Sequence, residues 1–399
     1  MIINKNKFVY SVLKVWLIVS SLYYLNAIFS GVDALKYNED LTQKFIKYAI
    51  CFIISSFILF NGKRVNFLWV SLFFIILSVA SVVIGNEVTV YATTMLIIAT
   101  MIGFSQIILY FSNDMSKINM VLLWTGIIVG TITVLELTVF YDYMVSYWVS
   151  TGGVRSISSL LNPTNSGAYS AIIILIALGT NIRSKFKKTL FVLMPMITLI
   201  SSGSRTAWLS LALTLLLTVL LNDKASIRLR KKILVIAGIG AICGVLYAAF
   251  YMSSISGIQS QYRGLDTYTA SIRVENFITY INSIDLGMLL PDFLDKNINL
   301  ISDNFYLVLL NYFGIVGFYI VFFSSMLLFY YDVQIKGFNK IIDIDESISV
   351  WRVIFIYFLI SGLSNSFINS FPVNQLFFIS CGYYVYKYNL IKKNVGKQI

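Results

Sequence analysis

Residues 118–140 read INMVLLWTGIIVGTITVLELTVF, and Glu136 is the only charged residue in this stretch. A helix needs about 17–25 apolar residues to cross a hydrocarbon layer roughly 30 Å thick, so the stretch predicts a transmembrane helix. A carboxyl group inside such a span is costly. Glu136 is therefore expected either to have a function or to be paired with another polar group.

Comparable apolar runs recur along the chain of 399 residues, of which 58% are hydrophobic and 12% charged. Water-soluble chains average about 45–50% apolar and about 25% charged residues. We therefore predict an all-α polytopic membrane protein in which residues 1–399 form a single integral membrane domain. The first run lacks a small-residue cleavage site, which favours a retained helix over a removed signal peptide. About twelve transmembrane helices are expected, at 12–31, 45–60, 66–85, 90–112, 118–140, 166–182, 189–203, 206–222, 233–251, 304–331, 350–369 and 373–388.

The basic residues define an orientation for these spans. The formal net charge is +12, and with the N-terminus in the cytoplasm 22 of the 30 Lys and Arg residues fall on the cytoplasmic side. This distribution follows the positive-inside rule, so topology explains the charge without any nucleic-acid partner, and both termini are expected in the cytoplasm. The predicted outer loops are 32–44, 141–165 and 252–303, and the predicted cytoplasmic loops are 183–188, 223–232 and 332–349.

The composition also excludes several kinds of catalytic site. The chain has no histidine, which removes Ser-His-Asp triads and the commonest metal ligand. Its three cysteines, Cys51, Cys243 and Cys381, each lie in an apolar run and predict no disulfide framework. No metal or other cofactor is expected. Any chemistry must come from helices and loops at the membrane face.

Four arginines on the predicted outer side, Arg155, Arg205, Arg263 and Arg273, run against the positive-inside rule. Guanidinium groups bind phosphate and carboxylate groups through two parallel hydrogen bonds, so outward-facing arginines suggest an anionic ligand. The alternative is that each pairs with an acid of the outer loops, such as Asp266 or Glu275, or extends to lipid headgroups.

Arg205 has the strongest local case, because almost no loop separates the spans on either side of it. Ser201-Ser202-Gly203-Ser204 precedes it, and an inward-running helix is expected to begin at Thr206, with its positive dipole end beside the guanidinium. Pro195 should kink or break the preceding span, which would let Ser201 to Arg205 lie below the membrane surface. The stretch therefore predicts a phosphate site. The alternative is that Ser204 is a plain N-cap and Arg205 lies at the headgroups.

Arg155 follows the pair Gly152-Gly153 and precedes Asn162-Pro163. Proline restricts the residue before it to an extended or turn conformation, and Asn165 or Ser166 is expected to cap the next helix. Capping alone would account for Asn165, but it leaves the outward-facing arginine unexplained.

The long outer loop contains an amphipathic pattern. Val274, Phe277, Ile278, Ile281 and Ile284 recur at helical spacing, with Arg273 at the border of the apolar stripe. We predict a helix that lies on the membrane. It can serve a site through Arg273, or it can be a surface anchor alone.

Asp303 stands at the outer start of the tenth span. A carboxylate there can act in catalysis or can simply be the N-cap of the helix. The helix start favours its ionised form, which makes it a weak base.

Three stretches of the predicted outer face share their order and spacing with one protein family. The first is Arg155 followed by Asn162-Pro163-Thr164-Asn165, and the second is Ser202-Gly203-Ser204-Arg205-Thr206-Ala207. Together with a third stretch they cover residues 150–320 and resemble the O-antigen ligase/polymerase superfamily, most closely its Wzy-type polymerases of O-antigen and capsular polysaccharide. The third stretch comprises Ser271-Ile272-Arg273 through Gly287, Asp303-Asn304-Phe305-Tyr306 and Gly314-Ile315-Val316-Gly317.

Two features depart from the family pattern. Its lipopolysaccharide ligases have a required histidine just before the Asn-x-Tyr-like segment, where this chain has Asp303. That difference favours a polymerase over a ligase. The turn reads NPTN where the family has an Asn-Pro-Asn-like sequence, which leaves the register of Asn165 open by one residue.

The resemblance implies a GT-C-like, metal-independent glycosyltransferase that joins undecaprenyl-pyrophosphate-linked repeat units at the outer face of a bacterial plasma membrane. Arginines would stabilise the departing pyrophosphate, and a base, for which Asp303 is the candidate, would take the proton of the attacking hydroxyl. The implied partners are the lipid-linked donor and acceptor, the bilayer, and a chain-length regulator and flippase of the same pathway. The implied catalytic residues are Arg205, Arg273 and Asp303, and the implied substrate-binding residues are Arg155, Asn162, Asn165, Ser204, Arg263, Asn304 and Tyr306.

A lipid-linked oligosaccharide flippase or another polytopic transporter is the main alternative, since twelve spans and outward arginines also suit a carrier of anionic substrates. Transporters usually place charged or unwound segments near the membrane midplane in repeated halves, whereas these arginines gather on one face. An O-antigen ligase is the second alternative. The choice among O-antigen, capsule and exopolysaccharide as the product stays open.

Overall fold

In the computed structural model, the described residues form helices and turns and no strand, which confirms the all-α prediction for this part of the chain. The described residues are 5–25, 41–61, 96–97, 100–140, 155–160, 162–220, 267–282, 304–310, 314–315, 345–367 and 370–395.

Several helices coincide with the predicted spans. Helix α7, Met115–Thr138, matches the span 118–140 to within three residues at each end. Pro195 lies inside α10 without ending it. The α-helices of the described residues are α1 (Lys5–Ser21), α3 (Leu41–Asn61), α6 (Ile107–Tyr110), α7 (Met115–Thr138), α9 (Pro163–Gly179), α10 (Lys185–Ser201), α11 (Arg205–Leu220), α13 (Thr267–Asn282), α16 (Glu346–Ser361) and α17 (Val373–Val395), with 3-10 turns at η1 (Ser112–Asp114) and η2 (Ser158–Leu160).

Helices α7 and α10 run in one direction, and α9 and α11 run in the other. Thr133 and Thr198, near the ends of α7 and α10, are hydrogen-bonded at 2.9 Å between their hydroxyl oxygens. Gly167, near the start of α9, packs directly against Ser204 at the start of α11. The starts of α9 and α11 therefore lie together with the ends of α7 and α10. We call this side of the bundle the arginine end.

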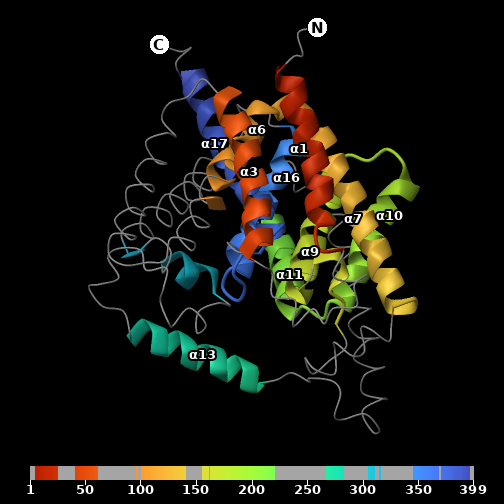
Figure 1. The fold of residues 1–399 in the computed structure, drawn as a ribbon, viewed down its shortest axis with the longest axis vertical. Helices are drawn as coiled ribbons and strands as arrows, with labels where there is room; N and C mark the ends of the chain where they lie inside the picture. The colour runs from red at the N-terminus through yellow and green to blue at the C-terminus, as the bar shows by residue number, and fades with distance from the viewer. Residues whose placement is uncertain are drawn as a thin grey trace.

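Both chain termini lie at the opposite side of the bundle, which we call the terminal end (Figure 1). Gly179, the last residue of α9, meets Val350 in the first turns of α16, so α16 starts at the terminal end and finishes at the arginine end. Figure 1 shows α1 and α17 extending from the bundle toward the two termini. This up-and-down arrangement places the junctions 155–160, 201–204 and 362–364 at one side.

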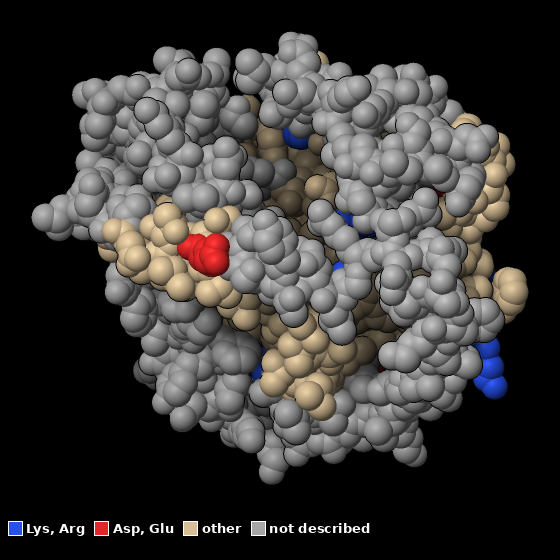
Figure 2. All heavy atoms as spheres, turned by 90° about the horizontal axis from the view of Figure 1, so that it is seen from below, with Lys and Arg blue, Asp and Glu red and all other residues tan. Residues whose placement is uncertain are grey.

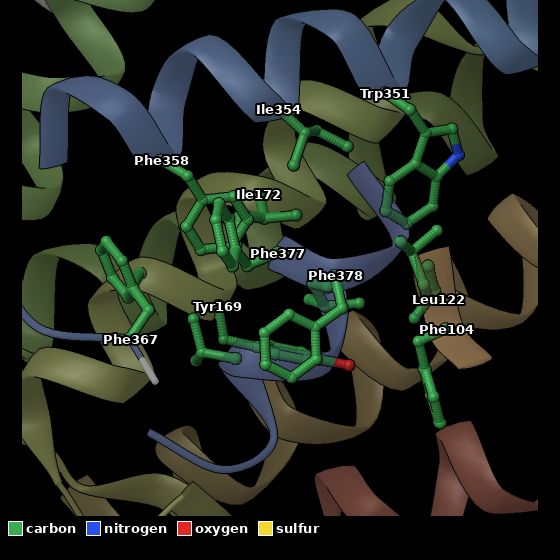
Figure 3. Close-up of a cluster of buried hydrophobic side chains, with 14 of the residues drawn as sticks. Phe104, Leu122, Tyr169, Ile172, Trp351, Ile354, Phe358, Phe367, Phe377 and Phe378 are labelled. Atoms are coloured by element: carbon green, nitrogen blue, oxygen red, sulfur yellow. The ribbon is translucent and has the colours of Figure 1, made fainter. Parts of the chain in front are cut away.

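Helix α9 is the centre of the bundle. Fourteen of its 17 residues are buried, because α7, α10, α11 and α16 all pack against it. A helix that is apolar on every side needs such a complete shell of neighbours. Figure 3 shows Ile172 of α9 beside Phe358 and Phe377, whose ring centroids are 5.2 Å apart. Tyr169 places its hydroxyl 2.6 Å from the Thr125 hydroxyl of α7.

Within the described residues, one helix is long and apolar enough to cross a membrane, from Ser112 to Thr138. Shorter apolar helices occur at Ile46–Ile58, Thr100–Tyr110, Pro163–Gly179 and Arg205–Thr218. A single long apolar helix is a weak indication of membrane association, since the core helix of a soluble protein has the same character. The twelve spans and their orientation stay predictions.

Helix α13 confirms the helix predicted from the periodicity around residues 274–284. Figure 1 shows it lying crosswise to the bundle, beyond the arginine end. Its apolar side chains Val274, Phe277, Ile278 and Ile281 are 40–57% exposed. Ile284 lies outside the described residues.

Candidate anion-binding site

The segment 155–160 and the turn 201–204 lie side by side at the arginine end. Ser156 N–H donates to Ser201 O at 2.8 Å, and Arg155 Nε–H donates to Ser202 O at 2.9 Å. A guanidinium carries its donors in a rigid plane, so the Nε–H bond fixes the direction of the whole group. Two of the three stretches that carry the family resemblance are thus in direct contact.

Gly203 allows this contact. Its φ is +57°, a left-handed conformation that side chains rarely adopt, and a Cβ atom placed there would lie 3.4 Å from Arg155 Cγ and 3.5 Å from Arg155 Nε. The turn that ends α10 therefore passes against the Arg155 side chain. Gly203 N–H donates to Ile200 O at 3.0 Å and closes the turn.

Helix α11 begins at Arg205, one residue before the predicted start at Thr206. Arg205 is exposed, and Ser204 before it is buried. The Ser204 hydroxyl lies 3.3 Å from the Thr206 hydroxyl. A cation in the first turn of a helix faces the positive end of the helix dipole, which disfavours it. An anion bound there would remove that repulsion, so the location of Arg205 favours an anion site.

Glu136, which the sequence identifies as a buried acid, accepts hydrogen bonds from the segment 156–158. Ser156 Oγ donates to Glu136 Oε2, and Ile157 N–H donates to Oε1 at 2.9 Å. Ser158 N–H reaches both carboxylate oxygens, at 3.1 and 2.9 Å. Glu136 has 0% exposure. The expectation that Glu136 is paired with polar groups is therefore confirmed, and its partners belong to the segment that carries Arg155.

Asn162 is the cap of α9, which corrects the prediction that Asn165 or Ser166 caps this helix. Its side-chain oxygen accepts from Thr164 N–H at 2.8 Å, and Pro163 occupies the first helical position. Asn165 lies within the first turn and is half-buried. Ser166 Oγ instead donates to Ile157 O at 2.5 Å and joins α9 to the segment 155–160. The predicted cap was wrong because Asn162 already has the extended conformation that a cap requires.

Asn304 and Tyr306 dock on the end of α16. Phe305 N–H donates to Gly362 O at 2.9 Å, and Tyr306 Oη donates to Leu359 O at 2.6 Å. Asn304 Oδ1 accepts from the N–H groups of Tyr306 and Leu307 at 3.0 and 3.2 Å. Asn304 thus caps the helix that follows. Asp303, for which the sequence also suggested a capping role, lies outside the described residues. Asn304 and Tyr306 share the arginine end with Arg155 and Arg205, since α16 finishes there.

The other predicted site residues are not placed. Arg263 and Asp303 lie outside the described residues, and Arg273 is described only as part of helix α13. Among the described residues, no group of three or more His, Cys, Asp or Glu side chains is arranged so that it could hold a metal ion. Figure 2 views the molecule from the arginine end, and some Lys and Arg atoms are visible among the described residues of this face.

Lys47 is a polar residue of this region that the sequence reasoning missed. It is 3% exposed, and its ammonium group donates to Tyr24 Oη at 2.8 Å. The rings of Tyr24, Tyr48 and Phe371 surround it, with centroids 5.3–5.4 Å from Nζ. Such rings stabilise a desolvated cation. The available signal was its position inside the predicted span 45–60, where a lysine is as unusual as Glu136 in its span.

No family model, curated protein sequence or solved structure matches this chain. The resemblance to the O-antigen ligase/polymerase superfamily therefore rests on the residues of the chain itself.

Proposed function

We propose that this protein is a multi-pass membrane glycosyltransferase, a Wzy-type polymerase that joins undecaprenyl-pyrophosphate-linked repeat units at the outer face of a bacterial plasma membrane. One observation carries the proposal. The Arg155 guanidinium is fixed against the turn that leads into α11, and Arg205 is the first residue of that helix. Two guanidinium groups and a helix N-terminus at one place form a suitable seat for a pyrophosphate.

The chemistry that we propose is a single displacement. A hydroxyl of the acceptor repeat unit attacks the anomeric carbon of the donor glycan, and a new glycosidic C–O bond forms. The C–O bond to undecaprenyl pyrophosphate breaks, and the bonding electrons leave with the pyrophosphate oxygen. Arg155 and Arg205 stabilise that developing charge, and a base takes the hydroxyl proton. Asp303 is our candidate for the base, and Arg273 for a further cation at the site.

The up-and-down helix arrangement supports a multi-pass topology, with the arginine end outside and both termini in the cytoplasm. A reporter fused after Lys232 should then behave as cytoplasmic, and a reporter inserted near Gln259 as exterior. A cytoplasmic signal from the second position would remove the outer-face site and with it the proposed reaction.

The decisive experiment uses purified protein in detergent with undecaprenyl-pyrophosphate repeat units and no nucleotide sugar. A polymerase should convert these units into a ladder of longer chains and release undecaprenyl pyrophosphate. A flippase would leave their length unchanged, and a ligase would transfer them only when lipid A core is added. Single units recovered intact after incubation with folded protein in detergent would contradict the proposal.

A further inference from the structure

The acid Glu136 is the feature of this region that the proposed reaction does not use. An ionised carboxylate without solvent needs several hydrogen-bond donors to be tolerated. Glu136 has three, and all of them come from Ser156, Ile157 and Ser158. Helix α7 therefore keeps a costly residue in order to bind one short non-helical segment.

The segment 156–158 could not easily hold its shape without this carboxylate. Ser158 has a φ of 49°, a left-handed conformation that is unfavourable for a residue with a side chain. Two consecutive backbone N–H groups, of Ile157 and Ser158, point at Glu136 and are buried with it. A buried N–H group that loses its acceptor destabilises the folded state, because it loses both water and its partner.

Other bonds fasten the same segment but do not replace Glu136. Ser158 Oγ donates to Val129 O at 2.9 Å, and Ser159 Oγ donates to Ser21 O at 2.6 Å. These bonds involve side-chain hydroxyls and fix where the segment lies between α1 and α7. The Glu136 bonds instead fix the orientation of its peptide groups.

The orientation of these peptide groups determines where Arg155 lies. Arg155 directly precedes Ser156, whose N–H bonds Ser201 O while its hydroxyl bonds Glu136. Arg155 Nε–H must then reach Ser202 O, the next residue of the same turn. A small rotation of the peptide groups of residues 156–158 would move the Arg155 guanidinium away from the turn at Gly203.

We propose that Glu136 is a positioning residue that holds Arg155 at the anion site through hydrogen bonds to residues 156–158, and that its negative charge takes no part in the reaction. This inference rests on the proposed function, because the site is the one that binds pyrophosphate. The geometry and the charge of residue 136 can be separated. Glu136→Gln keeps the length and one carbonyl oxygen for both N–H groups, and the Ser156 hydroxyl can accept from the new amide. Glu136→Asp keeps the charge, but its side chain is one methylene shorter, so the carboxylate lies farther from the N–H groups of residues 157 and 158.

The test is a rank order of affinities for undecaprenyl pyrophosphate, measured on purified protein in detergent. Glu136→Asp should lose about tenfold, and Glu136→Gln should stay within about threefold of the wild type. In an Arg155→Ala background, Glu136→Asp should cause almost no additional loss, because the two residues act as one unit. Thr133→Val is the matched control, since Thr133 lies one turn earlier on α7 but bonds Thr198 of α10; it should leave the affinity unchanged.

Hydrogen exchange separates the positioning role of Glu136 from the existence of the anion site, because it needs no ligand. Glu136→Asp should speed exchange of the Ile157 and Ser158 amides without any ligand, whereas Thr133→Val should not. Unchanged exchange in Glu136→Asp, or a greater loss of affinity in Glu136→Gln than in Glu136→Asp, would overturn the positioning role. Wild-type affinity in both Arg155→Ala and Arg205→Ala would instead overturn the proposed anion site, whatever the exchange data show.

Discussion

At the terminal end of α7, Asn119 donates to Ser347 O at 2.9 Å and accepts from Trp351 Nε1 at 3.1 Å. At the arginine end of the same helix, Glu136 accepts from the backbone of residues 157 and 158. Asn119 therefore joins two helices to each other, whereas Glu136 joins a helix to a segment that is not helical. The first arrangement stabilises the packing of the bundle. The second gives a loop one defined shape, which is what a binding site needs.

The exposed cations of the two ends also differ, in whether the proposed topology explains them. At the terminal end, Arg183, Lys185 and Lys187 are exposed on and before the start of α10, and under the proposed topology the positive-inside rule accounts for them. At the arginine end, Arg205 is exposed at the start of α11, and the same topology places it on the side where the rule disfavours it. In the function that we propose, one set of cations fixes the topology and the other binds the pyrophosphate. The following predictions test that distinction, from the largest expected effect to the smallest.

Replacing Arg205 should have the largest effect. Arg205→Ala should lower chain extension by about two to three orders of magnitude, because it removes a donor aimed at the leaving group's charge. Arg205→Lys should recover only part of it, since lysine keeps the charge but loses the planar pair of donors. Ladder formation on gels, normalised to protein level, measures both. Arg183→Ala is the matched control, an exposed arginine at the terminal end, and should extend chains normally; equal losses in the two alanine variants would erase the distinction between the ends.

Gly203→Ala should lower chain extension by about tenfold, because a misplaced catalytic group loses much of its effect. The new Cβ both strains the left-handed turn and approaches the Arg155 side chain. Gly203→Asn separates these causes, since asparagine tolerates the left-handed conformation but still adds a Cβ. Affinity for undecaprenyl pyrophosphate and thermal unfolding should be measured together. If Asn binds like the wild type while Ala binds weakly, strain in the left-handed turn is the cause. Equal losses of affinity in both variants would show that the added Cβ shifts the Arg155 side chain, and wild-type affinity in both would contradict a role of this turn in the site.

Asn119→Ala should destabilise the protein without weakening the site. The change leaves the buried Trp351 Nε1–H without its acceptor. Losing such an acceptor lowers the free energy of unfolding by about 1–3 kcal/mol. Thermal unfolding in detergent should therefore shift downward, while the affinity of the folded fraction for undecaprenyl pyrophosphate stays the same. A selective loss of affinity would show that the terminal end also shapes the site.

Asn162→Ala should have the smallest effect, about 1 kcal/mol of stability, because it removes the cap of α9. Asn162→Asp should restore this stability, since aspartate caps a helix as well as asparagine does. The pair also tests the role in substrate binding that the family resemblance implies for Asn162. Normal stability and normal chain extension in Asn162→Asp would assign the residue to capping, whereas normal stability with lost activity would assign it to the substrate.

The sequence by itself determined the helical class and the position of several helices. Apolar length is a property of one segment, and a run such as 118–140 can be interpreted without its neighbours. The sequence also identified Glu136 as a residue that needs a partner, since an acid in an apolar helix is unusual in any fold. Similarly, Arg205 could be placed at a helix start because serine and glycine precede it in the chain.

Only the tertiary structure decided which polar groups meet. Arg155 and the Ser202 carbonyl are 47 residues apart in the sequence, and they lie 2.9 Å apart because α9 and α10 return the chain to the same end. The partners of Glu136 are also distant in the sequence, 20 to 22 residues further along the chain. The caps at Asn162 and Asn304 depended on local backbone conformation, which several nearby polar residues could equally have adopted. Hydrogen bonds and cation–π contacts are short and directional, so the chain order of residues such as Lys47, Tyr24 and Phe371 does not reveal them until the helices are packed.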